Sequence, residues 1–393
     1  MAVYSVGILG LRLRQSVNGI PRGLGHAMQR ALSAAPQAMR SESVRDSGSK
    51  MTDGHMYNWR VRAVLNALNL AGKTDGPLEV SDLSALGHLD QYHYLGTEAC
   101  DHVATLLKLN PNSKCLDVGS GIGGPARYLS ALTGCAVVGV EFQPDLAQAA
   151  VELTRRVKGL SDRVCFVTGD ISDPSLRLPG DGDGDRVAES FDHFISLLVN
   201  LHVPDRPALL RNCFDRLKPG GTFVIEDFAQ NAPLLAVEED IVSELVSAPT
   251  VTSVEVYLDE LRRIGFVDLQ AVDMSAPWTA WTKARHELYA ASEAETVALH
   301  GQALFESRVL FYQAIDDLFA GGRLGGVKIT GRKPGGTHAV NSTINRPAAL
   351  SQRVAGDAGG ASTAPVNIIE GKKLADHMAT APLASRPAEA RVE

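Results

Sequence analysis

A turn dense in glycine directly follows a short apolar run, and this junction constrains the fold more than any other feature of the chain. The run Lys114-Cys-Leu-Asp-Val118 predicts a buried strand. Residues 119–124 contain four glycines, and a helical pattern follows from about residue 123. Because glycine has no Cβ atom, it lets the backbone turn sharply and approach a ligand closely. The junction therefore predicts a strand-to-helix turn at the ligand-binding edge of an α/β sheet.

Strands and helices alternate along the middle of the chain. Further strands are predicted at residues 136–141, 164–168, 191–196, 222–226 and 326–331. Helices are predicted at residues 123–132, 145–158, 206–217 and 253–264. Such alternation is typical of a doubly wound, mostly parallel α/β sheet with right-handed crossovers.

A helical insertion is predicted before the last strand. Between about residues 277 and 321, apolar and aromatic side chains recur at helical spacing. Large insertions near the carboxyl edge of a sheet shape binding sites, so this one is a candidate lid or substrate wall. Trp278 and Trp281 lie at the start of the insertion. The two alternatives for them are packing in the core and lining a cage around the substrate.

The two ends of the chain differ from its middle. Residues 1–48 place five arginines before the first acidic residue, Glu42, among many Ala, Ser and Gly residues. This composition is typical of an organelle transit peptide, and the excess of arginine favours the mitochondrion, with plastid or cytoplasm as alternatives. Residues 49–89 are predicted to form an N-terminal helical extension and residues 90–334 the main domain. Residues 335–393 are predicted to be a disordered tail.

Composition disfavours several classes of partner. The net charge of −7 offers no basic face to nucleic acid. No apolar run approaches the ~20 residues that a membrane-spanning helix needs. The five cysteines are scattered in no metal-ligand spacing, and Gly180-Asp-Gly-Asp-Gly-Asp185 lacks the carboxylate at the twelfth position of a calcium loop. We expect a small-molecule substrate and no metal, and the oligomeric state stays open.

The glycine turn alone fits two kinds of cofactor. Gly119-x-Gly121-x-x-Gly124 matches the dinucleotide fingerprint, with Glu141 about 20 residues further on. However, Asp117 precedes the first glycine by two residues, and its negative charge would repel a pyrophosphate at the helix N-terminus. A cofactor with positively charged sulfonium and ammonium groups is instead attracted by that negative charge. The carboxylate therefore favours S-adenosylmethionine over a nicotinamide or flavin cofactor.

Four motifs together resemble those of class I S-adenosylmethionine-dependent methyltransferases. They are Asp117-x-Gly119-x-Gly121-x-Gly123, Glu141, Gly169-Asp170 and Leu217-Lys-Pro-Gly-Gly221. The resemblance covers about residues 90–334. It implies a Rossmann-like, seven-stranded, mostly parallel sheet and S-adenosylmethionine as the cofactor.

The resemblance also implies roles for individual residues. Those implied to line the methionine part of the cofactor are Asp117, Gly119, Ser120, Gly121, Gly123 and Leu197. Glu141 would accept hydrogen bonds from both ribose hydroxyls. Asp170 and Ile171 would flank the adenine. Phe142 or Gln143 would cover its other face.

Two further segments resemble a subgroup that methylates small metabolites. The block from Gly119 to Tyr128 is similar to phosphoethanolamine, sarcosine/dimethylglycine, sterol and tocopherol methyltransferases. Upstream, the segment from Asp90 to Ala99, with its tyrosines and Gly96, resembles the tyrosine- and glycine-bearing segment that closes over the cofactor in the phosphoethanolamine and dimethylglycine enzymes. Its tyrosines and histidine suit a methylated cation, and Tyr94 is a candidate catalytic residue, with packing as the alternative.

His202 is the candidate general base. It stands where the phosphoethanolamine enzymes carry a catalytic histidine, and an ordinary histidine titrates near pH ~6.5. A packing role is the alternative. At Leu198 those enzymes carry an aspartate, so phosphoethanolamine itself is a less suitable acceptor for this chain.

The sequence leaves several chemical classes of methyl acceptor open. The first hypothesis is N-methylation of a small amine of the glycine-betaine or choline type. The alternatives are C- or O-methylation of a sterol, quinone or tocopherol type of acceptor, S-methylation of a small thioether, and an inactive relative that serves as a binding partner.

Overall fold

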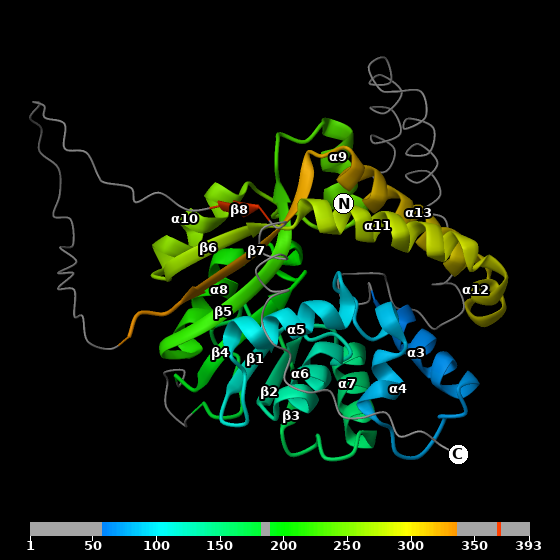
Figure 1. Ribbon diagram of the computed structural model, residues 1–393, viewed down its shortest axis with the longest axis horizontal. Helices are drawn as coiled ribbons and strands as arrows, with labels where there is room; N and C mark the ends of the chain where they lie inside the picture. The colour runs from blue at the N-terminus through cyan, green and yellow to red at the C-terminus, as the bar shows by residue number, and fades with distance from the viewer. Residues whose placement is uncertain (1–56, 182–188, 336–367, 371–393) are drawn as a thin grey trace, which may run out of the picture.

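The computed structural model describes residues 57–181, 189–335 and 368–370 (Figure 1). The predicted transit peptide, residues 1–48, lies outside the described residues. So do residues 336–367 and 371–393 of the predicted tail, and residues 182–185 of the segment Gly180–Asp185, which lacks the pattern of a calcium loop.

One mixed sheet forms the centre of the molecule. Its strands are β1 (Lys114–Val118), β2 (Ala136–Glu141), β3 (Val164–Thr168), β4 (Phe191–Leu197), β5 (Leu217–Gln230), β6 (Val267–Asp273), β7 (Leu324–Arg332) and β8 (Ile368–Glu370). Their order is β3-β2-β1-β4-β5-β7-β6-β8. Strands β1 to β5 run parallel, and β7 is antiparallel to both of its neighbours. The predicted doubly wound, mostly parallel sheet of seven strands is confirmed.

Two differences from the predicted strands have local causes. The motif Leu217-Lys-Pro-Gly-Gly221, which precedes the strand predicted at residues 222–226, falls within β5, because Leu217 pairs with Phe191 and the register then shifts before His193 pairs with Thr222. The short strand β8 pairs in parallel with β6 and extends the sheet by one strand. It comes from the segment that composition assigns to a disordered tail.

Helices cover both faces of the sheet. One layer holds α3 (Asn58–Leu70), α4 (Val80–Ser84), η2 (Gly87–Leu89), α5 (Gly96–Leu107), α6 (Gly124–Thr133) and α7 (Pro144–Arg156); the other holds α8 (Arg206–Arg216) and α10 (Val254–Ile264). Successive strand residues point to opposite faces, so Cys115 packs in the first layer and Leu116 in the second. Both cores are thus built from apolar strands with near-continuous burial.

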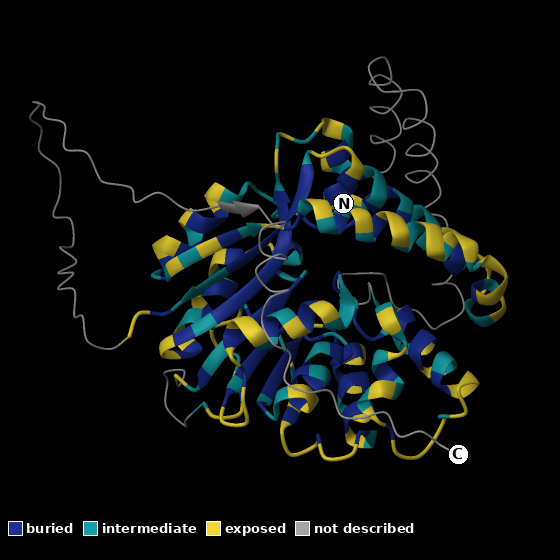
Figure 2. Ribbon diagram, viewed as in Figure 1, coloured by how far each residue is buried: buried dark blue, intermediate teal, exposed yellow. Residues whose placement is uncertain are grey.

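The predicted insertion before the last strand is confirmed as three helices between β6 and β7. They are α11 (Ser275–Ala291), α12 (Glu293–His300) and α13 (Gln302–Ala320), and they extend away from the end of the sheet toward α3 (Figure 1). Their bases pack with α9 (Ala236–Asp240) and η4 (Ile241–Leu245) in an apolar cluster that contains Trp278 and Phe319. We call α11 to α13 the lid; much of its outer surface is exposed (Figure 2). Within the described ranges, no helix has the length and apolar character needed to cross a membrane.

Candidate functional site

Most of the predicted site residues follow the carboxyl ends of β1, β2, β3 and β4, on both sides of the point where the strand order reverses. From β1 the chain passes to β2 on one side, whereas β4 lies on the other side. In open α/β sheets, ligands bind at this switch point. The glycine turn after β1 occupies it. Gly119 has a φ of 64°, and a Cβ atom there would lie 2.4 Å from Val199 Cγ1, so only glycine fits this position.

Glu141, at the end of β2, holds the glycine turn in shape. The backbone N–H of Gly121 donates to Glu141 Oε2 at 2.8 Å, and that of Gln143 donates to Oε1 at 2.8 Å. A carboxylate has about four acceptor positions, so further donors such as ribose hydroxyls still find room on it. Glu141 thus has a structural role, in the glycine turn, that the sequence did not indicate.

Asp117 and Ser120 supply polar atoms that have no partner. Asp117 Oδ2 and Ser120 Oγ are buried and find no hydrogen-bond partner among the described residues. Burial, with the nearby charge of Glu141, raises the pKa of Asp117 to about 8. A buried acceptor of this kind is stabilised by a cationic ligand, which favours its charged form. These residues therefore fit a cofactor that carries positive charge and no phosphate.

The remaining predicted cofactor residues lie around the same edge but differ in burial. Phe142 is 55% exposed, whereas Gln143 is buried and its Oε1 accepts from the backbone N–H of Tyr57 at 3.3 Å. Ile171 and Leu197 are buried in the second and first apolar layers. Asp170 is exposed, and its Oδ1 accepts from the backbone N–H and hydroxyl of Ser172 at 2.8 and 2.6 Å. Its other oxygen, Oδ2, is suited to accept a hydrogen bond from an amino group.

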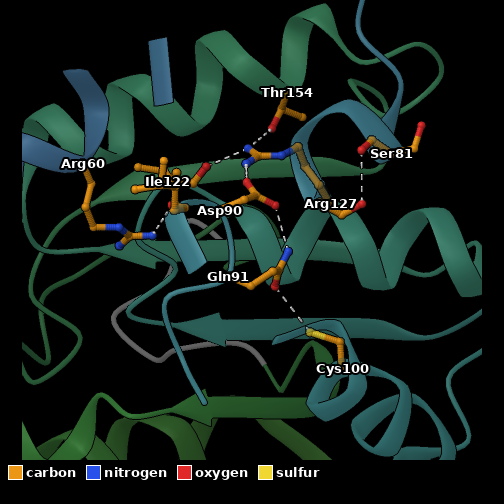
Figure 3. Close-up of polar contacts among 10 residues, drawn as sticks. Arg60, Ser81, Asp90, Gln91, Cys100, Ile122, Arg127 and Thr154 are labelled. Carbon is orange, nitrogen blue, oxygen red and sulfur yellow. Dashed lines mark hydrogen bonds and ion pairs between the residues drawn. The ribbon is translucent and has the colours of Figure 1, made fainter. Parts of the chain in front are cut away.

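A buried ion pair fastens the segment of residues 90–94 to the glycine turn. Arg127, on α6, donates from one NH group to Asp90 Oδ1 at 2.7 Å and from the other to the carbonyl oxygen of Ile122 at 2.7 Å (Figure 3). Gln91 donates to the second oxygen of Asp90 at 2.8 Å. A Cβ atom at Gly124 would lie 2.1 Å from the carbonyl oxygen of Asp90, so the two segments are in close contact.

His202 has a fixed tautomer. Its Nδ1 lies 2.9 Å from the carbonyl oxygen of Ser247, which can only accept, so Nδ1 carries the proton. Nε2 is then the basic nitrogen, and the Tyr57 hydroxyl lies 3.3 Å from it. Burial lowers the pKa of His202, which keeps the imidazole neutral at pH 7. The backbone just before it is strained, because Leu198 has a φ of 58°, a conformation that concentrates at functional sites.

Tyr94 and its neighbours are split between two environments. Tyr94 packs in the apolar cluster at the base of the lid, with its ring 4.7 Å from that of Trp281 and 5.0 Å from that of Trp278. His93 is buried, and its Nε2 donates to the carbonyl oxygen of Gly96 at 2.9 Å. Tyr92 faces α3 instead. A catalytic role for Tyr94 stays a prediction.

The N-terminal helix supplies two residues that the sequence did not single out. Tyr57 contacts both His202 and Gln143, as described above. Arg60, one turn further on, is 4% exposed and donates to the carbonyl oxygen of Leu89 at 3.0 Å. Its guanidinium lies next to the glycine turn, since a Cβ atom at Gly121 would be 3.4 Å from Arg60 NH1.

A separate hollow of about 400 Å³ lies elsewhere on the sheet. It is lined by residues of β5, β6 and β7, among them Gln230, Asp273 and Val327. None of the predicted site residues lines it, and the described part of the chain holds no group of three or more side chains suited to bind a metal ion.

Comparison with known proteins agrees with the geometry. Residues 116–225 match the family described as "Methyltransferase domain". The chain is 32% identical to phosphoethanolamine N-methyltransferase 1 of Arabidopsis thaliana over 180 residues, 45% of this chain and 33% of that protein. It is 32% identical to sterol 24-C-methyltransferase of Debaryomyces hansenii over 126 residues, 32% of this chain and 30% of that protein. The chain thus spans about a third of the length of these curated relatives.

The fold recurs in solved structures. Phosphoethanolamine N-methyltransferase 2 of Haemonchus contortus superposes with a TM-score of 0.56 at 18% identity, over 70% of this chain and 60% of that one. At this identity the likeness establishes the fold, which is the Rossmann-like fold of class I methyltransferases.

Proposed function

Because residues 116–225 form a methyltransferase domain, we propose that the chain is an S-adenosylmethionine-dependent methyltransferase that N-methylates a small amine. The observation that carries the cofactor assignment is the buried side chain of Asp117, two residues before the glycine turn, whose Oδ2 has no hydrogen-bond partner among the described residues. It suits a ligand with a sulfonium and an ammonium group and disfavours a pyrophosphate.

Methyl transfer requires mainly that the protein positions the acceptor relative to the cofactor. The cofactor supplies a methyl group on a sulfonium, and its departing part is neutral. The chain's own residues then have to hold the acceptor in line and exclude water. The buried segment of residues 90–94 and the lid are suited to the second task, because they pack over the carboxyl edge of the sheet.

A small amine adds one requirement, the loss of a proton. An amine that arrives as a cation has no lone pair with which to attack. His202 Nε2 carries a lone pair and is neutral at pH 7, so it is suited to take this proton as a general base. The Tyr57 hydroxyl lies 3.3 Å from Nε2, so the acceptor amine would either displace this hydroxyl from Nε2 or bind beside it.

A methyl-transfer assay distinguishes a small-amine acceptor from the other classes of acceptor. The purified chain and S-adenosylmethionine would be tested with glycine, sarcosine, dimethylglycine, phosphoethanolamine, a small thioether and prenylated phenols. We expect turnover with one of the amines. Turnover confined to the prenylated phenols would move the assignment to a lipid-like acceptor, and turnover confined to the thioether to S-methylation.

The ribose contact proposed for Glu141 leads to a prediction about the affinity for the cofactor. Glu141→Ala should raise the Kd for S-adenosylhomocysteine roughly 10-fold or more, because it removes an acceptor for hydroxyl groups and also frees the N–H of Gly121. Calorimetric titration measures the Kd, and the thermal unfolding of the unliganded variant shows whether the fold is kept. An unchanged Kd in a folded variant would remove Glu141 from the cofactor site.

Residues 1–48 are proposed to direct the protein to mitochondria. The support is their arginine-rich, acid-poor composition. Fused to a fluorescent protein, this segment should produce mitochondrial fluorescence, and replacement of Arg12, Arg14 and Arg22 by Gln should abolish it. A fusion with residues 49–89 is the matched control. Uniform cytosolic fluorescence from the intact segment would contradict the proposal, and a plastid pattern would reassign it.

A further inference from the structure

Three arginines without a carboxylate partner lie between the N-terminal helix and the lid. Arg60 belongs to α3, Arg285 to α11 and Arg308 to α13. No aspartate or glutamate among the described residues forms an ion pair with any of them. The Nε atoms of Arg60 and Arg285 are buried and have no hydrogen-bond partner in the part of the chain that the structure describes. We call these three side chains the arginine cluster.

Aromatic rings hold the arginine cluster together. Arg60 Cζ lies 4.3 Å from the centre of the Tyr92 ring, Arg285 Cζ lies 4.9 Å from that of Tyr312, and Arg308 Cζ lies 5.5 Å from that of Trp59. The rings themselves touch, since Trp59 and Tyr92 have centroids 6.1 Å apart. Three elements that are distant in sequence therefore bring their guanidinium groups against one set of neighbouring aromatic rings.

His88 joins the two halves of this arrangement. Its ring stacks on Tyr92 at 4.3 Å and lies 5.8 Å from the ring of Tyr312. Both of its ring nitrogens, and the Tyr92 hydroxyl, are buried without a hydrogen-bond partner among the described residues. Burial, and then the charges of Arg285 and Arg60, lower the pKa of His88, so the ring is neutral and offers one N–H donor. The cluster and His88 thus contain several donors for which the described residues offer no acceptor.

Arg60 is buried, and Arg285 and Arg308 are half-buried. Removing cations and unpartnered donors from water is unfavourable, and an oxyanion bound among them offsets this cost by accepting their hydrogen bonds and balancing their charge. We propose that the arginine cluster binds an oxyanion group, a phosphate or a carboxylate, of the methyl acceptor. This inference rests on the proposed function and narrows its substrate class to amines that carry a negatively charged group.

The position of the cluster relative to His202 supports this assignment. Tyr57 connects the two: its ring lies 5.2 Å from that of Tyr92, and its hydroxyl lies 3.3 Å from His202 Nε2. An acceptor anchored by its oxyanion at the arginine cluster therefore extends past Tyr57, with its amine toward His202. Small amines with an acidic group a few bonds away carry both of the groups that this arrangement would bind, whereas a neutral sterol or quinone has no charged group for the arginines to bind.

The first test uses simple anions on the full chain. Inorganic phosphate or acetate, compared with chloride at equal ionic strength, should raise the melting temperature of the wild type, because a ligand that binds only the folded state stabilises it. Stabilisation by phosphate alone indicates a phosphate-bearing acceptor, and stabilisation by acetate alone a carboxylate. Arg285→Gln and Arg308→Gln should each abolish the shift. Arg211→Gln is the matched control, since Arg211 is an exposed arginine over the Phe214 ring on α8.

Kinetics give the second test, with the amine that the assay panel identifies. Arg285→Gln and Arg308→Gln should each raise the KM for the acceptor about 10-fold or more and leave the Kd for S-adenosylhomocysteine unchanged. Where a Gln variant fails to melt cooperatively, Arg285→Lys replaces it and should show a smaller rise in KM, because it keeps the charge and loses the fork geometry.

Three results would overturn the inference. The first is a melting temperature that neither anion shifts. The second is an acceptor KM that the arginine variants leave unchanged. The third is anion stabilisation that saturating S-adenosylhomocysteine removes, because the anion would then occupy the cofactor's own site. In each case a thermal shift with S-adenosylhomocysteine would leave the proposed function standing.

Discussion

Replacing Arg127 with Met should lower the free energy of unfolding by about 3–5 kcal/mol, the usual cost of removing one partner from a buried ion pair. Arg127 is 1% exposed and Asp90 is 3% exposed, so the substitution leaves a carboxylate without its partner in a dry environment. It also leaves the carbonyl oxygen of Ile122 and the hydroxyl of Thr154 without a donor. Urea unfolding of the full chain measures the change.

The same substitution should also weaken cofactor binding, because Arg127 fastens residues 90–94 to the glycine turn. The matched control is Arg262→Met, which removes one partner of the exposed Arg262–Asp259 pair and should change the free energy by less than about 1 kcal/mol. Equal effects of the two substitutions would show that the Asp90–Arg127 pair does not organise this edge of the sheet. In the double variant Asp90→Asn with Arg127→Met, we expect a smaller loss than the sum of the single losses.

His202→Ala should lower kcat by roughly 100-fold or more, the usual scale for loss of a general base. The physical reason is the fixed tautomer, which leaves Nε2 as the basic nitrogen at the carboxyl end of β4. The Kd for S-adenosylhomocysteine should barely change, since His202 is not among the residues that we propose bind the cofactor. A steady-state assay with the amine that the panel identifies measures kcat, and calorimetry measures the Kd.

The pH dependence gives a separate check on His202. Burial lowers the pKa of its imidazole, so the charged form appears only below the ordinary value of about 6.5. The wild type should therefore keep full activity down to about pH 6.5 and lose it as the pH falls further. His202→Ala should lack this acidic limb. His193→Ala, at the opposite end of β4, is the control, and near-normal turnover with an intact profile in His202→Ala would reduce His202 to a packing residue.

Local sequence predicted most of the fold because its signals are local. Strands β1, β2 and β3 occupy the predicted residues, since each is a short apolar run between turns. The glycine turn is likewise encoded within a few residues, by the positive φ that Gly119 requires. Where a long-range pairing decides, the prediction was wrong: β5 begins at Leu217 because of its pairing with Phe191, and β8 exists only through its pairing with β6.

The part of the site that the sequence did not reveal depends on which face of a helix turns inward. Arg60 and Arg62 both follow apolar residues in the same helix, yet Arg60 is buried against the glycine turn and Arg62 is exposed. Nothing within the helix separates them. Likewise, Tyr57 meets His202 across 145 residues, and Asp90 meets Arg127 across 37. Such contacts arise from packing of distant segments, which periodicity does not encode.

Thermal unfolding of the full chain with S-adenosylhomocysteine and with NAD tests the central claim most directly. A ligand at 100 times its Kd stabilises the folded state by about 2.7 kcal/mol, so S-adenosylhomocysteine should raise the melting temperature by several degrees. NAD should leave it unchanged, because Asp117 lies two residues before the glycine turn, and its charged form, which a cationic ligand favours, would repel a pyrophosphate. A shift with NAD and none with S-adenosylhomocysteine would contradict the account.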